Sequence, residues 1–115
     1  MVEKSLAREL KRGTLEMILL KLLSPQPMYG YELITTLENK GGESFTLKEG
    51  TLYPVLYRLE DAGLVETEWK TLERGVARKY YNLTKAGARE LQRLIGEWQT
   101  FAGSVNRILE MEISE

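Results

Sequence analysis

Side chains that could perform catalytic chemistry are few in this chain. The 115 residues include no His and no Cys, so the commonest general base and the thiol nucleophile are both missing. The usual nitrogen and sulfur ligands of transition metals are missing with them, which leaves only carboxylates as candidate ligands. Carboxylates, Lys, Tyr and Ser or Thr remain, and no spacing among them forms a recognisable catalytic site. We therefore predict that the chain is not an enzyme and uses no metal or cofactor.

Binding chemistry is better represented, by cations gathered between residues 69 and 93. Seven Lys or Arg side chains stand there against two Glu, a net charge of +5, whereas residues 94–115 hold one Arg and four Glu, a net charge of −3. The total formal charge of −1 therefore conceals a basic segment and an acidic one. Contact with nucleic-acid phosphates requires such a local basic patch, although an isolated basic loop is often only a solvated surface.

The hydrophobic pattern predicts the elements that would position these cations. Apolar residues recur at helical spacing in 4–23, 29–39 and 48–62, and they alternate instead in 65–69 and 78–83. The predicted fold is mainly α with a small β-hairpin wing, in the order of a winged helix-turn-helix. In that fold the third helix lies in the DNA major groove and the hairpin contacts the flanking backbone.

Two residues leave alternatives open within these helices. Gly13 is a candidate division of the first helix into two. Pro54 carries no cost only in the first turn of a helix, so either the regular third helix begins near Gly50 or it is kinked.

The segment 85–112 is predicted to form one long helix, with Thr84 as its N-cap. Its apolar residues follow the 4,3,4,3,4 spacing of a coiled-coil seam, and at 1.5 Å per residue it would be about 42 Å long. Residues 1–84, a winged helix-turn-helix DNA-binding domain, are too few to cover that length. We therefore expect residues 85–115 to form a dimerisation helix in a homodimer, with folding back onto the first helix as the alternative. The expected interface residues are Leu91, Leu94, Ile95, Trp98, Phe101, Ala102, Val105, Ile108 and Leu109.

The third helix carries the side chains best suited to reading DNA. Hydroxyl groups come from Thr51, Tyr53 and Tyr57, and Arg58 offers a fork for a phosphate or a guanine edge. The alternatives are packing of the two tyrosines against the hairpin and an intrahelical pair between Arg58 and Asp61. The candidate DNA-binding residues are Lys48, Thr51, Tyr53, Tyr57, Arg58, Arg74, Arg78 and Lys79.

The second strand of the hairpin alternates its side chains between two faces. Arg78 and Lys79 should therefore point in opposite directions, with at most one squarely on the DNA side unless the strand end twists. Tyr81 shares a face with Leu83 and is expected in the core.

Three stretches of the chain resemble the PadR-like transcriptional regulators, in their short subfamily. They are MYGYEL at 28–33, EGTLYPVLYRLEDAGLV at 49–65 and RKYYNLTKAGARELQ at 78–92. The resemblance runs from about Leu10 to Leu109, and the order and spacing of the three stretches make it specific. It implies a homodimeric winged-helix repressor, with a DNA role for Thr51 and Tyr53.

Some members of that family bind ligands at their dimer interface. The resemblance therefore allows Trp98 and its symmetry mate, with Met17 and Phe101, to line a pocket for a flat aromatic or phenolic effector. The alternative is that Trp98 only anchors the interface. A dimer would read two half-sites of a palindrome-like operator, about 34 Å apart.

A second function is also compatible with the sequence, a winged-helix protein-interaction module without specific DNA binding. The net charge and the acidic residues Glu49, Glu60 and Asp61 on the third helix favour it, unless these carboxylates lie off the line of contact. The longest uninterrupted apolar run, Met17–Leu20, is far short of the roughly 20 residues of a transmembrane helix. We therefore expect a cytoplasmic protein with no membrane partner.

Overall fold

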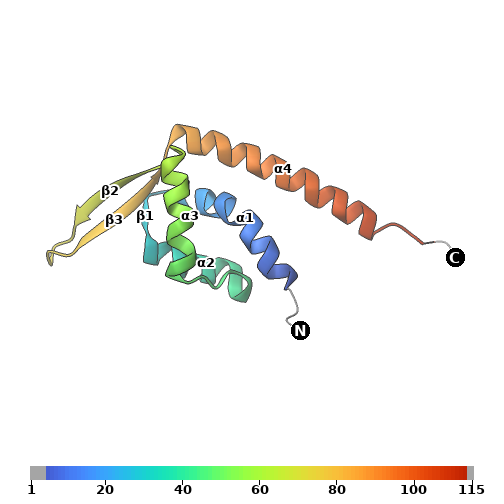
Figure 1. Ribbon diagram of the computed structural model, residues 1–115, viewed down its shortest axis with the longest axis horizontal. Coiled ribbons are helices and arrows are strands. Elements are labelled where there is room, and N and C mark those ends of the chain that lie inside the picture. Colours follow the sequence, from blue (N-terminus) through green and yellow to red (C-terminus); the bar gives the residue numbers. More distant parts are fainter. Residues whose placement is uncertain (1–4, 114–115) are drawn as a thin grey trace.

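The computed structural model describes residues 5–113. Its elements are α1 (Leu6–Leu23), β1 (Met28–Tyr29), α2 (Gly30–Gly41), the 3-10 helix η1 (Gly42–Phe45), α3 (Glu49–Asp61), β2 (Val65–Thr71), β3 (Ala77–Leu83) and α4 (Lys85–Leu109). Helices α1, α2 and α3 form one body, from which the β2–β3 hairpin and α4 extend in opposite directions (Figure 1). This is the predicted winged helix-turn-helix with a long last helix. Within the described residues, no helix combines the length and apolar character needed to cross a bilayer.

The sheet has three antiparallel strands in the order β1-β3-β2. The predicted hairpin pairs Val65 with Leu83 at its base and Thr71 with Ala77 near its tip, where Gly75 adopts a positive φ of 77°. Strand β1 was not predicted, because a two-residue strand is too short to show alternation. It pairs with β3 at the other edge, so it ties the start of α2 to the wing, as we call the β2–β3 hairpin.

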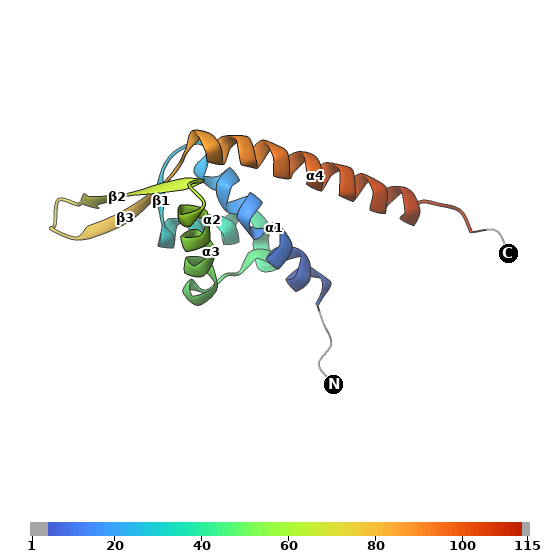
Figure 2. The ribbon, with the colours of Figure 1, turned by 45° about the horizontal axis from the view of Figure 1, so that its top comes forward.

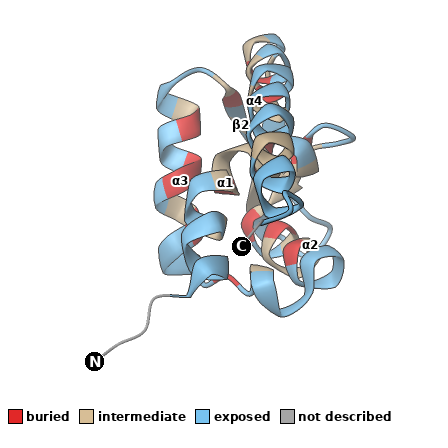
Figure 3. Cartoon of the chain, turned by 90° about the vertical axis from the view of Figure 1, so that its right-hand side faces the viewer, coloured by how far each residue is buried: buried red, intermediate tan, exposed pale blue. Residues whose placement is uncertain are grey.

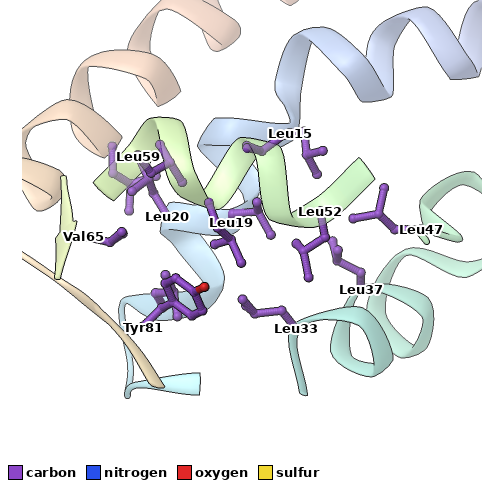
Figure 4. Packing of buried hydrophobic residues seen from close by; sticks show 14 residues of the cluster. Leu15, Leu19, Leu20, Leu33, Leu37, Leu47, Leu52, Leu59, Val65 and Tyr81 are labelled. Carbon is purple, nitrogen blue, oxygen red and sulfur yellow. The ribbon is translucent and has the colours of Figure 1, made fainter. Parts of the chain in front are cut away.

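The core lies between the three helices and the base of the wing, and leucines dominate it (Figure 4). Helix α1 runs unbroken through Gly13, so the possible division at that residue is wrong. Helix α3 begins at Glu49, close to the expected start near Gly50, but Pro54 lies inside the helix, beyond its first turn. The predicted core position of Tyr81 is confirmed, since 1% of its surface is exposed.

The start of α4 is fixed to the turn between α3 and β2. Thr84 is the N-cap as predicted: its hydroxyl oxygen accepts a hydrogen bond from the Gly87 N–H at 3.0 Å, and the hydroxyl donates to the Gly63 carbonyl at 2.7 Å. A side chain at Gly87 would collide with the Leu64 carbonyl. These contacts set the direction in which α4 leaves the body (Figure 2).

The two halves of α4 differ in burial (Figure 3). Leu91 is 3% exposed and belongs to the core of its own protomer, so little of its side chain is available to a dimer interface. Leu94 and Ile95 are partly buried against the same core. The helix ends at Leu109, three residues before the predicted end.

Candidate nucleic-acid interface

Helix α3 lies at the edge of the molecule with one face free (Figure 3). Its buried side is made by Leu52, Val55, Leu56 and Leu59. The opposite side carries Gly50, Pro54, Tyr57 and Asp61, all exposed. A groove borders this free face on each flank.

The first flank faces the wing and the start of α2, and we call its hollow the wing-side groove. It has a volume of about 510 Å³ and is lined by Tyr29, Gly30, Tyr31, Tyr53, Tyr57, Trp69, Arg78, Lys79 and Tyr81. Four predicted DNA-binding residues, Tyr53, Tyr57, Arg78 and Lys79, therefore lie together. Tyr31, 63% exposed, was considered from the sequence only as a residue that could reach a phosphate. Trp69, 66% exposed, was not assigned, because a single exposed aromatic residue carries no signal of its own.

Arg78 and Lys79 leave β3 on opposite faces, as alternation predicted. The Arg78 guanidinium lies 4.3 Å from the centre of the Tyr29 ring, and Lys79 Nζ lies 5.8 Å from that of Tyr57. Both nevertheless border the wing-side groove. Since β1 pairs with β3 only at Tyr80 and Tyr81, the β1 edge of the strand is free at both cations, which allows both side chains to reach this groove.

Tyr53 is half-buried, and its ring packs on Gly30 at the start of α2. Tyr53 therefore packs against α2, and it also borders the groove shared with the hairpin residues Arg78, Lys79 and Tyr81. Burial, followed by the charge of Glu49, raises the pKa of Tyr53, so its hydroxyl stays protonated at neutral pH. Tyr57, one turn on, is 52% exposed and is the more accessible of the two hydroxyls.

One carboxylate of α3, that of Glu60, contacts the wing. The Thr67 hydroxyl donates to Glu60 Oε2 at 3.1 Å, and Lys79 Nζ lies 3.8 Å from Glu60 Oε1. Both contacts hold Glu60 toward the wing. Asp61 remains exposed on the free face of α3.

Arg58 has a partner that the sequence did not indicate. Its Nε donates to Glu16 Oε1 on α1 at 3.4 Å, and its side chain remains 61% exposed. The alternative of an intrahelical pair with Asp61 is therefore wrong. Arg58 instead joins the second flank of α3, which faces α1.

The hollow on this second flank is the α1-side groove, with a volume of about 650 Å³. It is lined by Arg8, Lys11, Arg12, Leu15, Thr46, Leu47, Lys48, Gly50, Thr51, Pro54, Val55 and Arg58. Three predicted DNA-binding residues, Lys48, Thr51 and Arg58, meet here. Arg8, Lys11 and Arg12 were missed, since cations at the start of an amphipathic helix resemble an ordinary solvated face.

Arg74, the remaining predicted contact, lies in the loop at the far end of the wing (Figure 1). A shallow hollow there is lined by Leu72, Glu73, Arg74, Val76 and Arg78. The structure therefore separates Arg74 from the residues around α3, at the outer limit of the candidate interface.

The predicted effector residues are only partly brought together. Met17 and Trp98 line a mainly apolar pocket of about 400 Å³ between α1, η1 and α4, with Ala7, Leu10, Lys11, Thr14, Ile18, Ser44 and Phe45. Phe101 is not among these residues. It is 61% exposed and borders another hollow of α4, beside Arg93 and Glu97.

Glu97, on the same helix, forms an ion pair with Arg93. Arg93 Nη1 donates to Glu97 Oε2 at 2.7 Å and Arg93 Nε donates to Glu90 Oε1 at 2.7 Å. The hydrogen bond from Arg93 lowers the pKa of Glu90, and the same bond raises the pKa of Arg93. Both carboxylates are therefore compensated within α4.

Comparison with known proteins identifies the family. The model of the transcriptional regulator PadR-like family matches residues 19–93. A PadR family regulator from Eggerthella lenta has 38% identity and a TM-score of 0.80, with 90% of this chain and 88% of that one covered. A PadR-like regulator from Bacillus cereus has 34% identity and a TM-score of 0.79, covering 90% and 99%. The transcriptional regulator Rv3488 of Mycobacterium tuberculosis is 33% identical over 73% of this chain and 75% of its own.

Proposed function

Because this chain belongs to the PadR-like family of transcriptional regulators, we propose that it is a homodimeric repressor that reads a palindrome-like operator with α3. The observation that carries the proposal is the free face of α3, bordered on both flanks by cations. A recognition helix enters the major groove between two phosphate backbones, so cations on its flanks are where the phosphates would be.

The residues that we propose to contact DNA fall into two chemical classes. Thr51 and Tyr57 offer hydroxyls near the free face of α3, suited to the edges of bases. Arg78 and Lys79 on the wing offer charge without a preferred base, suited to phosphates. The exposed fraction of Tyr57, 52%, leaves its ring and hydroxyl available to a partner.

The proposed dimer rests on the apolar surface of the outer half of α4. Phe101, Ile108 and Leu109 are 61%, 67% and 76% exposed, and α1 adds Leu6 and Leu10 at 69% and 42%. An unpartnered apolar stripe of this length is a typical subunit interface. A second copy of the chain would cover it and would place a second α3 about one helical turn of DNA away.

Release by a small aromatic or phenolic effector is proposed at the pocket beside Trp98. Lys11 lines both this pocket and the α1-side groove, and its Nζ donates to the Thr46 carbonyl at 3.0 Å, two residues before Lys48. A ligand that displaced α1 would therefore disturb the side of α3 that faces DNA. A panel of planar aromatic and phenolic compounds tested against the DNA complex checks this step.

The experiment for the main proposal selects an operator from random duplexes with the purified protein, then compares variants. Thr51→Ala should weaken binding to the selected operator more than to random DNA, because it removes a contact near the bases. Lys79→Ala should weaken both about equally, because phosphates carry no sequence. If neither substitution changes affinity, α3 and the wing are not the DNA-binding surface.

The second candidate, a protein-interaction module, draws on the exposed aromatic rings of Tyr31, Tyr57 and Trp69 around one groove. Such rings are enriched at protein interfaces. Failure of the selection to enrich any sequence, with binding no tighter than to random DNA, would favour this candidate.

A further inference from the structure

Helix α1 extends beyond the core that it helps to build. Leu15 and Leu19 pack in the core, and the same stripe of the helix continues toward its N-terminus through Arg8 and Arg12, which are exposed. Arg8 precedes Leu15 by seven residues and Arg12 precedes Leu19 by seven, so each lies two turns away on one face. The stripe thus changes from leucine to arginine where α1 leaves the core. Beyond this point its side chains are suited to binding an anionic partner rather than to packing.

The first part of α3 lies opposite this end of α1, across the α1-side groove. Five cations line the α1-side groove, contributed by α1 and by α3 with the residue before it: Arg8, Lys11, Arg12, Lys48 and Arg58. Glu16 contacts Arg58. Within residues 5–113, no carboxylate lies within ion-pair distance of Arg8, Arg12 or Lys48.

The position of this groove identifies the kind of anion. It borders the flank of α3 that carries Thr51, while the wing-side groove borders the other flank. The DNA major groove likewise has a phosphate backbone on each side. We propose that the α1-side groove holds the second phosphodiester backbone of the duplex that α3 reads, with Arg8 and Arg12 as its phosphate contacts. This inference rests on the proposed DNA-binding function and extends the interface to α1.

The five clustered cations should destabilise the free protein, and this effect can be measured. Five like charges around one groove repel one another in the absence of a partner. Replacing Arg8 and Arg12 should therefore leave the melting temperature unchanged or raise it slightly, and a merely structural role would lower it. Since Ser5 caps α1 through the backbone N–H of Arg8, substitution of the side chain leaves the cap in place.

The test uses the double variant Arg8→Ala/Arg12→Ala of the full chain, with the selected operator and a random duplex of equal length. Binding to both should weaken by about tenfold or more, and the slope of log K against log salt should fall by about 0.9 for each phosphate that the variant no longer neutralises. The conservative pair Arg8→Lys/Arg12→Lys should retain most of the affinity. Lys21→Ala, an exposed cation in the last turn of the same helix, is the matched control and should bind as the parent does.

The wing variant Lys79→Ala, measured alongside, separates the two proposals. If it weakens binding while the α1 double variant binds as the parent does, DNA recognition stands and the role of α1 is wrong. A loss confined to the selected operator would also overturn the inference, since backbone contacts are blind to sequence. If the parent protein binds no DNA, both proposals fail together.

Discussion

The ring of Tyr53 lies directly against Gly30, so this side chain of α3 fills the space at the start of α2 that a Cβ would otherwise occupy. A Cβ at position 30 would collide with the phenol group. Gly30→Ala should therefore lower the free energy of unfolding by about 1–3 kcal/mol, the usual cost of overpacking. It should also weaken operator binding, because the ring it displaces lines the wing-side groove. Urea denaturation and DNA titration measure the two effects.

Gly13→Ala is the control for this prediction, because open space surrounds that glycine within α1. It should stabilise the protein by up to about 1 kcal/mol through helix propensity. In a Tyr53→Ala background the cost of Gly30→Ala should largely vanish. Equal costs in the two backgrounds would show that the contact between these residues does not limit position 30.

The buried phenol of Tyr81 makes stability depend on alkaline pH. Burial raises the pKa of Tyr81 to about 12, from 10.0, so the folded state favours the neutral form. The unfolded chain then ionises first, so the contribution of Tyr81 to stability is constant below pH 10 and is lost between about pH 10 and 12. Two pKa units correspond to at most about 2.7 kcal/mol. Tyr81→Phe should flatten this fall in denaturation curves recorded across the window, whereas Tyr31→Phe, at an exposed ring, should leave it unchanged.

The proposed dimer can be broken without touching the core. Val105 and Leu109 lie on the outer half of α4, 37% and 76% exposed, and the double variant Val105→Glu/Leu109→Glu should be monomeric. Burying two unpaired carboxylates at an interface costs several kcal/mol. Thr100→Glu, exposed on another face of the same helix, is the control. Light scattering that finds a dimer in the double variant would move the interface elsewhere.

The sequence predicted the elements well where a period extended over several turns or along a strand. The helical stripe of α3 and the alternation ending at Tyr81 each indicated which side faces inward. Strand β1 escaped prediction because its pairing with β3 is a contact between distant segments rather than a local pattern.

The candidate site was predicted only in part, because some of its contacts likewise join distant segments of the chain. Tyr57 and Lys79 could be assigned from their own segments, since the winged-helix order says which elements face DNA. The partner of Arg58 is Glu16, 42 residues away, and the groove containing Arg8 exists only because α1 crosses the start of α3. Such neighbours depend on how helices pack, which no single segment encodes.

The central claim is that α3, bordered by cations on both flanks, binds duplex DNA. The most direct test is the affinity for the selected operator, measured from 50 to 200 mM salt. With six or more phosphates neutralised by a dimer, the affinity should fall by about a thousandfold or more across this range, linearly on logarithmic axes. An affinity that does not change with salt, or no binding beyond that to random DNA, would contradict the account.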